Sequence, residues 1–228
     1  CVEALAAVTG VATDRRLAAL SELWLAQAQA MKPGSGQQAA WLETIRYAYA
    51  YLFFGDYAPG ERAFEDRQTQ VRDWYNHAVE RAATDMFEVR QQMPSQLLVQ
   101  TGWNIAGWEL KLDMRGARLP GSTAVPAELL PASSLSFRGL RSLYRRDGFG
   151  AELVTVMPDD TPTVAPTRDG RPAARRNQRP PPWSEMPAPS MTVLLHPEGD
   201  DLDSVLHTRT VRLTVHDPYV ESAIMLRG

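Results

Sequence analysis

The spacing of apolar residues changes about half-way along the chain. Up to about residue 93 they recur every three or four positions, as in amphipathic helices, and later segments alternate apolar and polar residues, as in half-buried strands. Three helices are therefore predicted. The first has Thr13 or Asp14 as its N-cap and ends at residues 33–36, the second runs from about Gln37 to Gly55, and the third runs from about Glu61 to Met93.

The second of these helices is apolar around most of its circumference, so it must be covered on more than one side. Its richest stretch, Tyr47–Phe54, is far shorter than the ~20 apolar residues that span a bilayer, which indicates a buried helix. Short turns between the three helices predict antiparallel neighbours. Residues 75–79 are similar to helical-hairpin repeats of the tetratricopeptide kind, although no second copy follows at that period.

Alternation predicts short strands in the second half of the chain. The clearest is Trp108–Met114, where apolar residues alternate with charged ones. Further strands are predicted at residues 135–137, 153–157, 191–195 and 211–215, and residues 220–226 are predicted to return as the second strand of a hairpin. Asp200, Asp201 and Asp203 predict the start of a short helix through Leu206.

A segment rich in proline and arginine interrupts these strands. Residues 158–189 hold more than half of the 17 prolines, and five arginines lie between Arg168 and Arg179, which predicts an exposed loop. The predicted fold class is therefore α+β, with antiparallel helical hairpins packed on a strand-rich C-terminal half. We expect a helical region at 1–94, a strand-rich region at 95–157, the loop at 158–190, and C-terminal strands at 191–228, with residues 95–228 sharing one core with 1–94.

Composition is that of an ordinary globular protein. The 228 residues are enough to bury a core without disulfides or metal, and a formal net charge of −3 gives no reason to expect nucleic acid as a partner. Lys32 and Lys111 are the only lysines among 24 basic residues. This arginine excess indicates a GC-rich genome more than a function.

Cys1 is the only cysteine, which excludes an intrachain disulfide and a cysteine-based metal site. Two interpretations of its position stay open. A mature bacterial lipoprotein begins with a lipid-modified cysteine, so Cys1 is a lipidation candidate; alternatively, it is an internal residue of a longer chain. The first interpretation places the protein in the bacterial cell envelope, in the periplasm or at the outer membrane, with a membrane surface within reach of the lipid anchor.

Motifs for catalysis are missing from the sequence. It has no Gly-x-Ser-x-Gly elbow, no His-Glu-x-x-His helix and no phosphate-binding glycine loop, so no catalytic residue, cofactor or metal is predicted. His77 is expected at a solvated rim of the third helix. His196, His207 and His216 lie in the C-terminal strand region, where histidines are more often structural than metal ligands. The pair Asp200–Asp201 is expected to flank a turn or cap a helix.

The most unusual segment runs from Leu135 to Gly150. Its candidate binding residues surround one tyrosine: Arg138, Arg141, Tyr144, Arg145 and Arg146. The guanidinium group of arginine binds phosphate and carboxylate groups through two parallel hydrogen bonds. This segment could therefore contact an anionic or lipid-headgroup surface. We favour the plainer interpretation of a structural loop whose arginines pair with the acidic face of the third helix. Gly139, Gly148 and Gly150 indicate backbone geometry that a side chain would forbid.

Several stretches together are similar to one family. They are residues 48–54, 62–76, 139–141, 146–151 and the hairpin at 213–226 with its Asp217–Pro218 turn. These stretches resemble the region that precedes the catalytic core in large bacterial envelope proteins of the α/β-hydrolase superfamily, of the lipase and esterase kind. The resemblance implies that a nucleophile elbow follows later in the chain. The family's nucleophile, acid and histidine have no matching positions here, and the end at Gly228, just after a strand, fits a chain that continues.

Two hypotheses of function follow. The first is an accessory N-terminal portion of an envelope hydrolase acting on ester or lipid substrates, whose partner is the catalytic remainder of the same chain or a partner protein. The second is a non-enzymatic envelope lipoprotein or helical interaction module that binds a partner protein. In either case the 228-residue chain is expected to lack a catalytic triad of its own.

Overall fold

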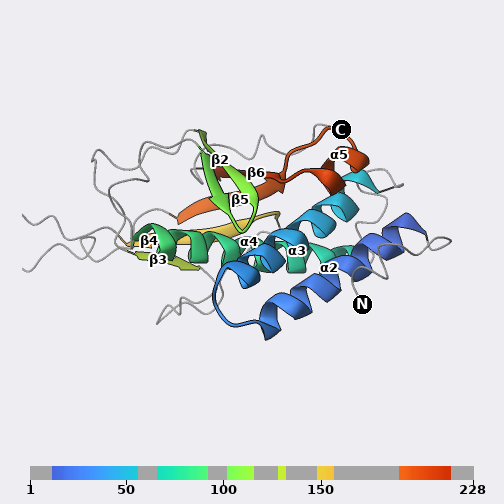
Figure 1. Cartoon of the computed structure of the whole chain (residues 1–228), viewed down its shortest axis with the longest axis horizontal. Helices are drawn as coiled ribbons and strands as arrows, with labels where there is room; N and C mark the ends of the chain where they lie inside the picture. Colours follow the sequence, from blue (N-terminus) through green and yellow to red (C-terminus); the bar gives the residue numbers. More distant parts are fainter. Residues whose placement is uncertain are drawn as a thin grey trace, which may run out of the picture.

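Helices come first in the structure and a mixed sheet follows, which confirms the α+β class (Figure 1). The computed structural model describes residues 12–55, 66–91, 102–115, 128–131, 148–156 and 190–216. The helices are α2 (Thr13–Ala30), α3 (Ser35–Phe54), α4 (Asp66–Gln91) and α5 (Leu202–His207). The strands are β1 (Gly102–Ile105), β2 (Trp108–Arg115), β3 (Glu128–Pro131), β4 (Ala151–Val156), β5 (Ser190–Pro197) and β6 (Thr210–His216).

The described strands form one sheet in the order β1-β2-β6-β5-β4-β3. Neighbours run antiparallel except β2 and β6, which are parallel. Leu110 pairs with Val211, and Leu213 pairs with Leu195, so the alternating apolar residues of successive strands share one face. The predicted strands around residues 108–114, 153–157, 191–195 and 211–215 are therefore confirmed.

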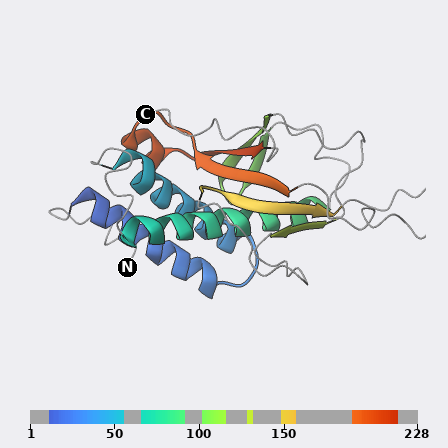
Figure 2. The same ribbon diagram turned by 180° about the vertical axis from the view of Figure 1, so that it is seen from behind.

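The helices cover that apolar face in layers. Helices α3 and α4 contact each other and strands of the sheet, and α2 packs against α3 and α4 on the side away from the strands (Figure 2). One cluster of buried residues runs through all of these elements, from Leu17 in α2 through Trp41 in α3 and Tyr75 in α4 to Leu195 in β5. The core thus lies between the helical layer and the sheet.

Helix α3 occupies the centre of this arrangement. Trp41, Leu42, Ile45, Ala48 and Ala50 are all buried, although they point in different directions around the helix. They are covered because α3 contacts α2, α4, α5 and β5. The expectation of a helix buried on more than one side is confirmed, and Gly55 ends it as predicted.

Two details of the elements differ from the prediction. The N-cap of α2 is Ala12, with no side-chain hydrogen bond, and Thr13 and Asp14 lie inside the first turn, so the predicted N-cap was wrong. Asp14 is buried there, where a carboxylate also suits the positive end of the helix dipole. Strands β1 and β3 were not predicted, because each is only four residues long and carries little alternation, and β3 also ends in a proline.

The short aspartate-rich helix is confirmed as α5. Asp201 is its N-cap and accepts a hydrogen bond from the Ser204 backbone N–H at 2.7 Å, while the Asp201 backbone N–H donates to the Ser204 hydroxyl. These hydrogen bonds lower the pKa of Asp201. One residue of the aspartate pair, Asp201, therefore caps a helix, as predicted.

Other predictions lie outside the described residues. They are the strand at 135–137, the loop at 158–189, the hairpin strand at 220–226, the start of the third helix at 61–65 and the boundary between residues 94 and 95. They stay predictions.

Candidate functional site

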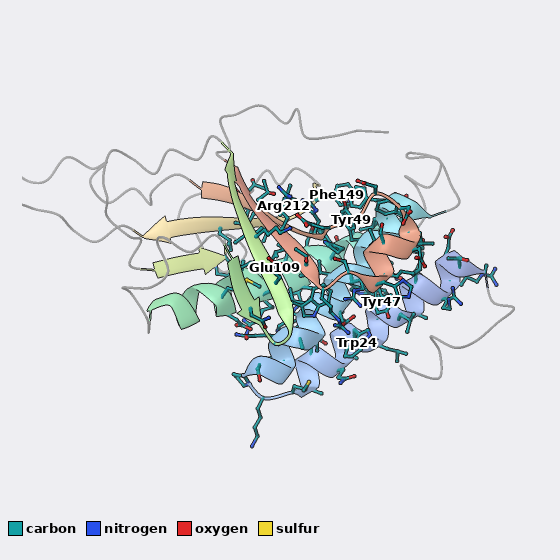
Figure 3. All side chains as sticks on the ribbon, turned by 45° about the horizontal axis from the view of Figure 1, so that its top comes forward. Trp24, Tyr47, Tyr49, Glu109, Phe149 and Arg212 are labelled. Carbon is teal, nitrogen blue, oxygen red and sulfur yellow. The ribbon has the colours of Figure 1, made fainter. Side chains whose placement is uncertain are left out.

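Four rings meet where the C-terminal half of α3 lies beside the end of β5, and we call them the aromatic strip: Tyr49, Phe53, Phe149 and His196. Figure 3 labels two of them, Tyr49 and Phe149. The ring centroids of Tyr49 and Phe53 are 4.6 Å apart, and those of Phe53 and Phe149 are 5.0 Å apart. The His196 ring stacks on Tyr49 at 5.7 Å with an interplanar angle of 23°. These separations are those of favourable aromatic pairs.

Helix α3 places two of the rings on one face. Tyr49 and Phe53 are four residues apart, so their side chains lie one above the other on the helix surface. Phe53 is 44% exposed, a high value for so large an apolar residue within a packed cluster. Tyr49 is half-buried, and this burial raises the pKa of its hydroxyl. The strip is therefore half-buried at Tyr49 and open at Phe53.

The third ring is held by a clamp between α4 and the segment before β4. The side-chain amide of Asn76 donates to the Gly148 carbonyl oxygen at 2.9 Å, and its oxygen accepts from the Gly150 backbone N–H at 2.7 Å. Both hydrogen bonds flank Phe149, so they fix the backbone that carries this ring. Asn76 thus presents Phe149 to Phe53.

Gly150 makes this clamp possible. Its φ is +101°, a conformation that residues with a side chain rarely adopt, and a Cβ built there would lie 2.6 Å from the Val193 carbonyl oxygen. The backbone of β5 therefore passes too close for any other residue. The expectation that this glycine has special backbone geometry is confirmed.

His196 lies where β5 extends beyond its neighbour. The last paired residues of β4 and β5 are Ala151 and Val193, so residues 194–197 continue past the end of β4. Tyr75 of α4 anchors this extension, because its buried hydroxyl donates to the Leu195 carbonyl oxygen at 2.8 Å. Burial raises the pKa of that hydroxyl strongly, so Tyr75 stays neutral. The extension brings His196 to Tyr49.

Charged groups continue the surface from His196 across the sheet. Arg212 of β6 is the direct cross-strand partner of His196. Both Lys111 and Arg212 contact the Glu198 carboxylate, at 2.7 Å and 2.5 Å. The hydrogen bond from Lys111 is the main cause that lowers the pKa of Glu198, and Arg212 adds to it. Two cations thus share one ionised carboxylate beside the aromatic strip.

A second charged cluster lies between α3 and the sheet, where Glu43 and Arg46 are buried and Arg209 is exposed. Glu43 binds Arg46 at 3.0 Å and Arg209 at 2.6 Å, and the Arg46 guanidinium lies 4.1 Å from the Trp108 ring centroid. Arg46 also donates to the Thr208 carbonyl oxygen. Burial lowers the pKa of Arg46, while Glu43 opposes that shift. This cluster joins α3 to β2 and to the turn after α5, so its role is structural.

The structure does not describe the predicted site residues. Arg138, Arg141, Tyr144, Arg145 and Arg146 all lie outside the described residues, and so does Cys1. The prediction of an anion-binding or structural arginine loop therefore stays untested, as does the lipidation candidate.

The histidines are placed separately. His77 is exposed on α4 and packs its ring against the edge of Trp41 at 5.6 Å, which confirms a rim position. His207 contacts Asp203 on α5, whereas His196 stacks on Tyr49. Within the ranges that the structure describes, no group of three histidine, cysteine, aspartate or glutamate residues could hold a metal ion.

Sequence reasoning missed the aromatic strip. The signals were present: an aromatic run in α3, and a phenylalanine between two glycines at residues 148–150. They are about 95 residues apart, however, and the hydrogen bonds of Asn76 that bring them together cannot be deduced from spacing.

Comparisons with known proteins add no family or fold assignment. The chain matches no protein-family model, no curated protein and no solved structure. Of the helices that the structure describes, none is long and apolar enough to cross a bilayer.

Proposed function

We propose that this chain is an accessory, non-catalytic portion of a bacterial envelope α/β-hydrolase of the lipase and esterase kind. In this proposal the aromatic strip contacts the apolar part of an ester or lipid substrate. The observation that carries it is the exposure of Phe53 within rings that a rigid scaffold holds. The family itself rests on the sequence resemblance alone.

The strip has the properties of an apolar binding surface. Phe149 is fixed by the Asn76 clamp, and Tyr49 and Phe53 by a helix that is buried on several sides. Rings held in place lose little conformational freedom when a ligand covers them, so more of the gain from apolar burial appears as affinity. A hydrocarbon chain of an ester substrate is one ligand that fits such a surface.

The alternative is a non-enzymatic envelope lipoprotein or helical interaction module. Exposed aromatic residues on a rigid element are typical of protein-interface hot spots as well, and Phe53 is such a residue. In the hydrolase proposal the partner is the catalytic remainder of the same chain or a partner protein. In both proposals Cys1 would attach the protein to a membrane of the envelope.

The test uses the native polypeptide that contains these residues. We expect a fluorophosphonate probe to label a serine of that polypeptide, or of a co-purifying partner, outside residues 1–228, and the 228-residue chain alone to show no turnover of nitrophenyl esters. Turnover of nitrophenyl esters by the 228-residue chain contradicts the proposal. So does a native protein in which the probe labels neither the polypeptide nor a co-purifying partner.

The role of the strip is tested in the same native protein. Phe53→Ser should raise KM for a long-chain nitrophenyl ester by about fivefold, because roughly half a phenylalanine side chain of contact is lost. KM for the acetate ester should not change. The control is Leu23→Ser, which alters a comparably exposed apolar residue on α2. An equal rise in KM for both esters argues against contact between Phe53 and the substrate.

A further inference from the structure

Two neighbouring tyrosines at the aromatic strip differ in what their hydroxyl groups bind. Tyr75 is buried, and its hydroxyl donates to the Leu195 carbonyl oxygen at 2.8 Å. Tyr49, whose ring centroid lies 6.4 Å from that of Tyr75, is only half-buried. Within the part of the chain that the structure describes, the Tyr49 hydroxyl makes no hydrogen bond. A tyrosine in an apolar cluster usually finds a partner for its hydroxyl, so this donor is left to solvent or to a ligand.

We propose that Tyr49 determines the specificity of the strip, because its hydroxyl donates a hydrogen bond to the carbonyl oxygen of an uncharged ester whose hydrocarbon chain lies on Phe53 and Phe149. The inference rests on the proposed apolar contact and adds the residue that recognises the ester group. An ester carbonyl accepts hydrogen bonds and donates none, so it complements a free hydroxyl donor.

The order of the rings places Tyr49 where the apolar contact ends. Phe149 contacts Phe53 at 5.0 Å, Phe53 contacts Tyr49 at 4.6 Å, and His196 stacks on Tyr49 at 5.7 Å. A chain that lies on the two phenylalanines, of which Phe53 is the more exposed, removes apolar surface from water on both molecules. The next ring along this order is the first that carries a hydroxyl, so the polar end of the ligand meets Tyr49.

The protonation state of Tyr49 suits a donor. Burial raises the pKa of its hydroxyl above the ordinary value, so the group keeps its proton at neutral pH. A carbonyl oxygen has two lone pairs and can accept from Tyr49 and from a second donor at the same time. Binding at Tyr49 is therefore compatible with recognition of the same ester by a catalytic part outside the 228 residues.

The ring of Tyr49 is held in place independently of its hydroxyl. It contacts the rings of Phe53, Phe54, Tyr75 and His196, at centroid separations between 4.6 and 6.4 Å. A side chain that is already fixed loses little conformational freedom when a ligand binds. Tyr49→Phe removes the donor and keeps every one of these ring contacts, which makes it a sharp test.

The test measures binding of two uncharged probes to the 228-residue chain by nuclear magnetic resonance titration. Methyl hexanoate carries an ester carbonyl, and 1-chlorohexane has an alkyl chain but no carbonyl. Tyr49→Phe should raise Kd for methyl hexanoate about fivefold, as for the loss of one neutral hydrogen bond, and leave Kd for 1-chlorohexane unchanged. Phe53→Ser should raise Kd for both probes by similar factors.

Tyr47→Phe is the matched control. It makes the same chemical change in a half-buried tyrosine of α3, two residues away, where the side chain faces a different direction and pairs with Arg46. Binding of both probes should be unaffected. The midpoint of urea denaturation should not fall in Tyr49→Phe, because no hydrogen bond within the protein is lost. A clear fall would show that the hydroxyl has a structural partner and would overturn the inference.

The outcomes separate this inference from the proposed function. If Tyr49→Phe leaves ester binding unchanged, or weakens both probes equally, the hydroxyl does not recognise the ester, and the apolar contact of the strip still stands. If neither probe binds the unaltered chain, the inference and the apolar contact both fail. Labelling by the fluorophosphonate probe tests the hydrolase assignment independently of either result.

Discussion

Gly150 shows how much one residue can determine about the aromatic strip. Its φ of +101° and the Val193 carbonyl oxygen 2.6 Å from a Cβ position leave no room for a side chain. Gly150→Ala should therefore lower the free energy of unfolding by about 3 kcal/mol, since backbone strain adds to a steric clash with main chain. Urea denaturation of the purified chain measures this change.

Gly107 is the control for that variant. It also has a positive φ, of 82°, in the turn between β1 and β2, but nothing lies within 4 Å of a Cβ there. Gly107→Ala should lower the free energy of unfolding by only about 1 kcal/mol, because the backbone is strained but the new side chain meets no neighbouring atom. Equal losses for the two glycines would mean that the close approach to β5 is not what requires Gly150.

At the scale of the element, α3 is fixed to the sheet by a buried ionic cluster. Glu43→Gln should cost about 3 kcal/mol of stability, because it leaves the Arg46 guanidinium buried without its carboxylate. The double variant Glu43→Leu with Arg46→Met should be less destabilised than the single one, since it removes the buried charge altogether. Thermal or urea unfolding of the wild-type chain, the single variant and the double variant measures these differences in stability. A double variant that loses more than the single would contradict this account.

The same helix shows what periodicity can and cannot predict. The length and burial of α3 follow from its apolar residues, which surround the helix, and from Gly55 at its end. Glu43 and Arg46, by contrast, look like a solvated pair three residues apart. They are buried because Thr208 and Arg209, more than 160 residues later, lie against them. No local pattern contains that information.

At the scale of the whole molecule, the helices and the strands share the buried cluster. We expect a fragment of residues 1–94 to be molten, because it loses the strands that cover Tyr75 and the α5 segment that covers α3. It should bind a hydrophobic dye and melt without a cooperative transition, in contrast to the full 228-residue chain. A sharp monomeric melt of the fragment would instead favour the helical interaction module.

The order of the strands could not be predicted from the sequence either, because it depends on contacts between residues far apart in the chain. Alternation located β2, β4 and β6, because one face of each strand is buried, and an apolar run located β5. The parallel pairing of β2 with β6 depends on which strands meet across the core, and Leu110 and Val211 are about 100 residues apart. The candidate site shares this property, since its rings come from α3, from β5 and from the segment before β4.

The place of β6 between β2 and β5 has a consequence for biosynthesis. A ribosome completes β2 long before β6, so the middle of the sheet stays open until residue 216 has been made. Until then α3 and α4 can form as helices, but the strands that complete the sheet over their apolar sides have not yet been made. Non-local pairing of this kind is slow, and the waiting chain is prone to aggregate. The nascent polypeptide therefore depends on a chaperone more than a helical bundle of the same length would, because the sheet cannot close before residue 216 has been made.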